Sequence, residues 1–177
     1  MKRIMLVVLI LLLTVGSLTA RPSSVAVGAQ LGFAASGVVV DVGLGSLYLQ
    51  AGIGYPLGIA YIGTVGGADD AFVDVATLTA DVSQAFSLSE NFDIKVGIGT
   101  TAFTNFQPII FGLAGPVLKG EYWVPNKNFG LTLTLNVPIM AYGYVEDDEI
   151  FTGGFVFDAF LPLMGLVTST VGVLYSF

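Results

Sequence analysis

Five charged residues interrupt a sequence that otherwise alternates apolar side chains with small ones, and they are the first candidates for chemistry. They are Asp81, Asp93, Lys95, Lys119 and Glu121. Paired carboxylates, or a lysine beside a carboxylate, can serve as general acid and base. Ionisable groups inside a narrow interior more commonly pair with one another, because an unpartnered buried charge is costly. The sequence therefore predicts an ion-pair network of these five residues and no enzyme activity.

The amino-acid composition excludes other chemistry. The 177 residues include no histidine and no cysteine, so they offer no imidazole base, thiol nucleophile, disulfide, lipid-attachment residue or usual zinc site. The glycine-rich stretch "GLGSLYLQAGIG" lacks the lysine and Ser/Thr of a phosphate-binding loop. The acidic run at 146–149 lacks the ligand spacing of a calcium loop. We expect neither a metal site nor a cofactor.

The elements that carry these charges alternate with a period of two. In "FDIKVGIGTTAF" (92–103), Ile94 and Val96 share one strand face, and Asp93 and Lys95 share the other. Hydrophobic residues make up 54% of the chain and charged ones only 11%, which suits a membrane β-barrel that turns its apolar face to lipid. Eight strands are expected, at 24–33, 38–44, 47–55, 75–86, 92–103, 116–123, 131–142 and about 166–177. The predicted fold is an all-β, antiparallel, up-and-down transmembrane barrel.

The connections between these strands alternate in length. Those at 45–46, 87–91 and 124–129 are short, whereas those at 56–71 and 143–164 are long. Short periplasmic turns opposite longer outer loops are typical of bacterial outer-membrane barrels. The stretches 57–63 and 154–163 also alternate, so a barrel of ten strands is the alternative if both pair.

The N-terminal segment predicts export. Lys2 and Arg3 precede an apolar run over 5–15 and small residues ending at Ala20, as in a secretory signal peptide. We therefore expect a cleaved signal at 1–20 and a single barrel domain at 21–177. That domain carries four basic residues against 13 acidic ones, so nucleic acid is excluded as a partner, because binding it needs a basic face.

The last residues, "STVGVLYSF", place an apolar row on one face of the final strand: Val171, Val173, Tyr175 and Phe177. This ending resembles the C-terminal signal by which outer-membrane proteins are handed to the barrel-assembly machinery. In length and strand number the chain resembles the small eight-stranded barrels of the OmpA transmembrane domain, OmpX and OmpW types. The resemblance implies a bacterial outer-membrane location with membrane lipid and the assembly machinery as partners, and it gives no activity by itself.

Two functions remain open at this stage. One is a narrow channel or binding site for a small apolar molecule, and the other is a structural or adhesive surface protein that presents outer loops without transport. An eight-stranded barrel is nearly filled by its side chains, so a general porin is excluded. Inward glycines predict either tight curvature or a pocket at mid-height. The predicted lumen pocket comprises Gly52, Gly54, Gly97, Gly99, Tyr48, Phe103, Met140 and Tyr142.

Overall fold

β-Strands dominate the computed structural model, which describes residues 24–67, 74–106, 110–145, 148–153 and 160–177. The predicted signal peptide at 1–20 lies outside these residues. The strands are β1 (Val25–Gly32), β2 (Ser36–Leu44), β3 (Leu47–Tyr55), β4 (Ala76–Ser89), β5 (Phe92–Thr104), β6 (Ile110–Trp123), β7 (Phe129–Asn136), β8 (Met140–Val145), β9 (Asp148–Gly153) and β10 (Thr170–Ser176). Two helices, α2 (Leu57–Val65) and α3 (Phe160–Thr168), interrupt the strands. No helix among the described residues is long and apolar enough to cross a membrane.

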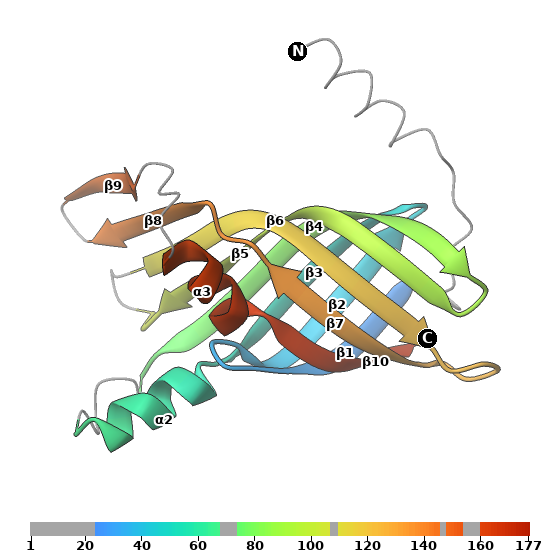
Figure 1. The fold of residues 1–177 in the computed structure, drawn as a ribbon, viewed down its shortest axis with the longest axis horizontal. Helices are drawn as coiled ribbons and strands as arrows, with labels where there is room; N and C mark the ends of the chain where they lie inside the picture. The colour runs from blue at the N-terminus through green and yellow to red at the C-terminus, as the bar shows by residue number, and fades with distance from the viewer. Residues whose placement is uncertain (1–23, 68–73, 107–109, 146–147, 154–159) are drawn as a thin grey trace, which may run out of the picture.

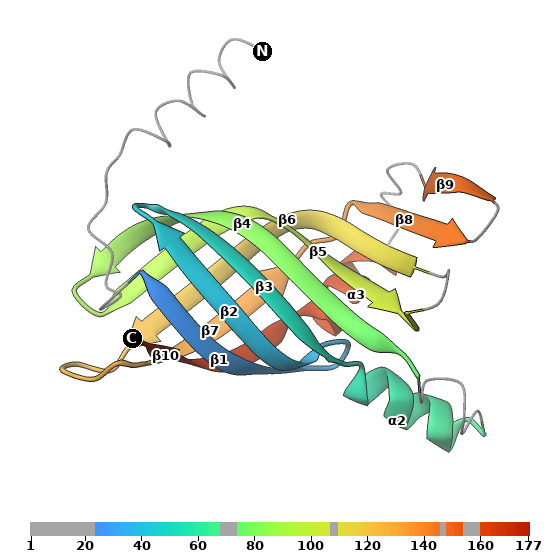
Figure 2. The same cartoon turned by 180° about the vertical axis from the view of Figure 1, so that it is seen from behind.

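The strands close into a cylinder (Figures 1 and 2). Hydrogen bonding runs in the order β5-β4-β3-β2-β1-β10-β7-β6, and β6 pairs with β5 to complete the circle. Every pairing is antiparallel, and β10 lies between β1 and β7. The C-terminal strand is thus a closing strand and leaves no open edge on either side. The predicted all-β antiparallel barrel of eight wall strands is confirmed.

The two faces of the wall have opposite character. In β2, Val38 and Val40 are exposed while Asp41 is fully buried, and in β5, Ile98 is exposed while Lys95 is fully buried. Alternation along each strand sends charged side chains inward and large apolar ones outward. A soluble barrel shows the reverse distribution. A small apolar cluster also lies inside, formed by Ala26, Val39, Trp123 and Leu174.

The two ends of the barrel differ. At one end, which also holds the C-terminus, short turns join β2 to β3, β4 to β5 and β6 to β7. The two-residue turn at Gly45 and Ser46 requires a positive φ (70° at Gly45), which glycine adopts without strain. At the other end lie α2, α3 and β9 (Figure 1). We call these the turn end and the helix end.

The two additional strands considered from the sequence are not wall strands. Residues 57–65 form α2 and residues 160–168 form α3, so the ten-strand alternative is wrong and the last strand begins at Thr170 instead of near Leu166. Residues 154–159 lie outside the described part. Short apolar runs that contain glycine fit a helix as well as a strand, because periodicity cannot separate the two over so few residues.

β7 and β8 form one wall strand interrupted by a bulge. Asn136 pairs with Val117, but pairing resumes with Met140 opposite Ala114, so β7–β8 holds one residue more than β6 over this stretch. Pro138 lies in the bulge, where its missing N–H does no harm. A one-residue shift reverses the faces of everything that follows it. β9 pairs with β8 beyond the wall.

Candidate functional site

Two aspartates, with a glutamine between them, form a row that faces two lysines across the half of the lumen nearest the turn end. We call the two aspartates the acidic row. Asp41 on β2, Gln50 on β3 and Asp81 on β4 are neighbours in register. Lys95 on β5 lies opposite Lys119 on β6. All five positions are inward by the alternation of their strands, so closure of the barrel brings the two groups together.

Direct ion pairs join these groups. Lys95 Nζ lies 2.6 Å from Glu121 Oε1 and 3.3 Å from Asp41 Oδ2. Lys119 Nζ lies 2.6 Å from Asp81 Oδ2. The side chains of Lys95 and Lys119 have no exposed surface, so their charges depend on these partners for the stabilisation that water would otherwise give.

Neutral side chains complete the network. Gln50 Oε1 accepts a hydrogen bond from Lys119 Nζ at 3.0 Å, and Gln50 Nε2 donates to Asp41 Oδ2 at 3.4 Å. The ammonium group of Lys95 lies 3.6 Å from the ring centroid of Tyr48, close enough for a cation–π interaction. These contacts occupy the half of the lumen nearest the turn end. We call the side chains that make them the plug: Asp41, Tyr48, Gln50, Asp81, Lys95, Lys119 and Glu121.

The structure brings four of the five predicted network residues into two ion pairs, Lys95–Glu121 and Lys119–Asp81. Asp93 is fully buried opposite Glu121, and its Oδ1 accepts a hydrogen bond from Ser87 Oγ at 2.5 Å.

Sequence reasoning omitted four other participants: Asp41, Gln50, Tyr48 and Trp123. Trp123 Nε1 donates to Glu121 Oε2 at 3.3 Å. All four occupy inward positions, so listing inward polar residues by register across neighbouring strands would have found Asp41 and Gln50.

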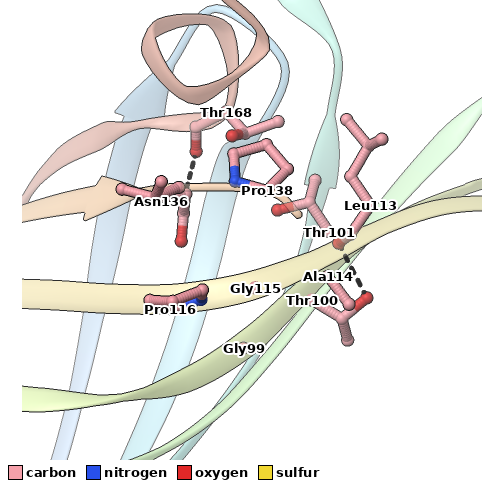
Figure 3. A pocket seen from close by; sticks show the side chains of 11 residues that line it. Gly99, Thr100, Thr101, Leu113, Ala114, Gly115, Pro116, Asn136, Pro138 and Thr168 are labelled. Atoms are coloured by element: carbon pink, nitrogen blue, oxygen red, sulfur yellow. Dashed lines mark hydrogen bonds between the residues drawn. The ribbon is translucent and has the colours of Figure 1, made fainter. Parts of the chain in front are cut away.

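Two small voids lie in the middle of the lumen. The larger has a volume of about 20 Å³ and is bordered by Gln30, Thr79 and Thr134 among others. The smaller, about 10 Å³, lies between Gly99, Gly115 and Pro116 on one side and Asn136, Pro138 and Thr168 on the other (Figure 3). Voids of this size hold about one water molecule each. Neither void has room for a ligand, so neither supports the pocket predicted at mid-height.

The glycines predicted to open a pocket instead let neighbouring strands approach closely. A Cβ on Gly97 would lie 2.0 Å from Val82 O, and one on Gly54 would lie 2.4 Å from Ser36 O. At Gly52 the nearest atom is Thr79 Oγ1, at 2.6 Å. These contacts favour the curvature interpretation. Gly99 alone of the four borders a void, and that void is the smaller one.

Met140 and Tyr142, which the sequence placed in the lumen, lie on the outer face of the wall instead. Tyr142 lies opposite Gly112, and its hydroxyl oxygen is 2.7 Å from Thr100 Oγ1 on the outer face of β5. The physical reason is the bulge at Pro138, which reverses the alternation of the strand. The same reversal applies to Met140.

A much larger cavity lies at the helix end. It has a volume of about 720 Å³ and lies between α2, α3 and the ends of β5 and β6. We call it the mouth cavity. Its lining is Phe33, Pro56, Ile59, Ile62, Val75, Phe103, Thr104, Asn105, Phe111, Leu113, Leu163, Met164, Val167 and Thr168. Phe103 is the one member of the predicted pocket that borders it, and its ring stacks on that of Phe111 with centroids 6.4 Å apart.

The hydroxyl oxygens of both threonines that line the mouth cavity are already engaged. Thr104 Oγ1 accepts a hydrogen bond from the Phe106 N–H at 3.0 Å, and Thr168 Oγ1 donates to Met164 O at 2.9 Å. The described lining includes no charged side chain. A cavity of this size and character suits an uncharged apolar molecule, because such a ligand leaves no polar group of its own unpaired.

The four residues of the predicted assembly signal share the outer face of the wall along the final strand, which runs from α3 to the turn end. Val171, Val173, Tyr175 and Phe177 are all exposed. The rings of Tyr175 and Phe177 meet edge to face with centroids 5.4 Å apart. Comparisons with protein-family models, curated proteins and solved structures find no match to this chain.

Proposed function

We propose that the protein is an integral outer-membrane β-barrel that is closed to solutes and binds one small, uncharged, apolar molecule at its outer mouth. The mouth cavity is the observation that carries this proposal. Its volume of about 720 Å³ lies within the range of roughly 300–1,000 Å³ usual for small-molecule sites.

The outer surface supports a membrane location. Large apolar side chains cover it on every side of the wall, as at Leu49, Ile98, Leu133 and Val173. Exposed apolar area of this extent is unfavourable in water and marks contact with protein or membrane. The predicted leader and the terminal apolar row support export and delivery to the barrel-assembly machinery.

The lumen favours binding over transport through the barrel. The ion pairs of Lys95 and Lys119 fill the half nearest the turn end, and the voids above them have room for about one water each. With the turn end in the periplasm, the mouth cavity faces the outer leaflet, and the plug lies between it and the periplasmic end of the lumen. A ligand held there would leave by the side from which it entered.

Methionine methyl resonances provide a direct test. Beyond the predicted signal, the chain has two methionines: Met164 lines the mouth cavity, and Met140 lies outside it. Titration of the ¹³C-methyl-labelled barrel with naphthalene should shift the Met164 signal saturably, because ring currents act only at close range. The Met140 signal should move little.

Two variants on α2 sharpen this test. Ile59→Trp places a larger side chain in the lining of the mouth cavity and should weaken the saturable Met164 shift, whereas Leu57→Trp, on an exposed position outside the lining, should preserve it. If both methyl signals of the unaltered protein drift together without saturation, naphthalene is only partitioning into the surrounding amphiphile. That result would overturn the binding proposal and favour the structural alternative.

A further inference from the structure

The short helix α3 occupies a place in the barrel wall. It leads directly into β10, whose neighbours are β1 and β7. The carbonyl of Val167 accepts a hydrogen bond from the N–H of Ala34, just beyond β1, at 3.1 Å. The carbonyl of Thr168 accepts one from Asn136 Nδ2, at the end of β7, at 2.6 Å. α3 therefore has the same neighbours as β10 and continues the wall where β10 stops (Figure 1).

The wall needs such a continuation at this point. β10 has 7 residues and β1 has 8, whereas β4, β5 and β6 have 14, 13 and 14. At about 3.4 Å per residue and a tilt of about 40°, β10 covers about 18 Å of the roughly 25 Å apolar band of a membrane barrel. A nine-residue helix adds up to about 13 Å along its axis.

The side chains of α3 suit this position. Leu163 and Leu166 are 55% and 72% exposed, and the sequence of the helix, FLPLMGLVT, contains no charge. Met164 borders the mouth cavity, and Gly165 packs so closely on β7 that a Cβ would lie 2.5 Å from Asn136 O. One side of α3 thus packs on the barrel, and the other extends the outward apolar row of β10.

The carbonyl groups at the C-terminal end of α3 are all satisfied. The Met164 carbonyl accepts from Thr168 Oγ1 at 2.9 Å, and the Gly165 carbonyl accepts from Ser169 Oγ at 2.6 Å. The Leu166 carbonyl accepts from the Ser169 N–H at 3.3 Å. With the bonds from Ala34 and Asn136, each carbonyl from 164 to 168 has a donor. Helix ends normally rely on water for several of these groups, and hydrocarbon supplies no donor.

We infer that α3 is a lipid-embedded helix that replaces the upper part of a wall strand and lies against the acyl chains of the outer leaflet. The inference rests on the proposed membrane location. It places a single helix between the mouth cavity and the hydrocarbon, with Met164 on the inner side and Leu166 on the outer.

Quenching of tryptophan by brominated lipid tests this placement. The variants Leu166→Trp, Val173→Trp and Lys127→Trp place an indole on α3, on the wall strand β10 and on the exposed β6–β7 turn. Each folded barrel is reconstituted in phosphatidylcholine vesicles brominated either near the glycerol end or near the methyl end of the acyl chain. Trp123 is buried in the lumen and contributes a constant background.

We expect Leu166→Trp to be quenched as strongly as Val173→Trp, chiefly by bromines near the glycerol end, and Lys127→Trp to be quenched little. Quenching at Val173→Trp without quenching at Leu166→Trp would overturn the inference and leave the membrane barrel intact. No quenching at either position would contradict the membrane location itself. Should Leu166→Trp fail to fold, Leu166→Cys labelled after folding with a thiol-reactive fluorophore, in a chain without other cysteines, carries the same expectation.

Discussion

Lys95 and Lys119 are the residues on which the closed lumen depends most. They face each other across β5 and β6 without exposed surface, a juxtaposition of like charges that is unfavourable by itself. The acidic row of Asp41 and Asp81 and the nearby Glu121 offset this repulsion. The plug is therefore sensitive to the loss of any one partner.

Replacing Lys95 with methionine should destabilise the barrel strongly. The change keeps most of the side-chain volume but leaves Glu121 without the ammonium group at 2.6 Å. Breaking one partner of a buried pair typically costs about 3–5 kcal/mol. Reversible urea unfolding in lipid vesicles measures the effect. The control is Lys127→Met on the exposed β6–β7 turn, which should stay within about 0.5 kcal/mol of the parent. Equal midpoints for both variants would contradict the plug.

Gly97 should tolerate no added methyl group. A Cβ at 2.0 Å from Val82 O forces the β4 and β5 backbones apart, and overpacking of this kind typically costs about 1–3 kcal/mol. Gly120→Ala is the matched control, because its Cβ would first meet a Phe92 ring atom at 3.4 Å. Urea midpoints should fall for Gly97→Ala and hold for Gly120→Ala. If Gly97→Ala is as stable as its control, the glycine leaves space, and the pocket alternative considered from the sequence is favoured over curvature.

The inward charges were predictable because alternation within one strand fixes which face a residue takes, as with Asp93 and Lys95. Their partners were harder to identify. Asp41 meets Lys95 across the barrel, and that contact depends on the register of every strand between them. Periodicity along a single strand carries no such information.

At the scale of elements, Asn136 links β7 to the end of α3. Its Nδ2 donates to Thr168 O at 2.6 Å. Asn136→Ala should lower the stability of the barrel by about 1–3 kcal/mol, because a carbonyl away from water then loses its donor. Thr64→Ala on α2 is the control, since it removes an exposed side-chain bond to Ala60 O and should change stability little. Urea unfolding of both variants measures this difference in stability. An unchanged midpoint for Asn136→Ala would show that water replaces the lost donor.

Two features at this scale could not be predicted by period alone. "LTLTLNVPIMAY" alternates without interruption, yet the bulge reverses its faces after Asn136. Pro138 was the available signal, because proline in a wall strand is typical of a bulge. α3 begins with a Phe-Leu-Pro-Leu run whose alternation resembles a strand, whereas its C-terminal carbonyls bond to Asn136 and Ala34, contacts that only the closed barrel provides.

At the scale of the whole molecule, the barrel combines an apolar exterior, a charged plug at the turn end and an apolar mouth at the helix end. Such a lumen should not conduct ions. Planar-bilayer recordings of the refolded protein should show no steady open-channel current, because the fully buried Lys95 and Lys119 ion pairs fill the passage. Long-lived, uniform current steps from the unaltered protein would contradict the closed lumen.

The most direct test of the central claim is electrophoresis of the protein recovered from the outer membrane of a producing bacterium, with and without boiling, after extraction with alkaline carbonate. A closed barrel should stay in the carbonate-resistant fraction and should migrate differently when it is not boiled, because hydrogen bonding around the whole wall resists detergent. Release by carbonate, together with identical mobility of boiled and unboiled samples, would contradict an integral outer-membrane barrel.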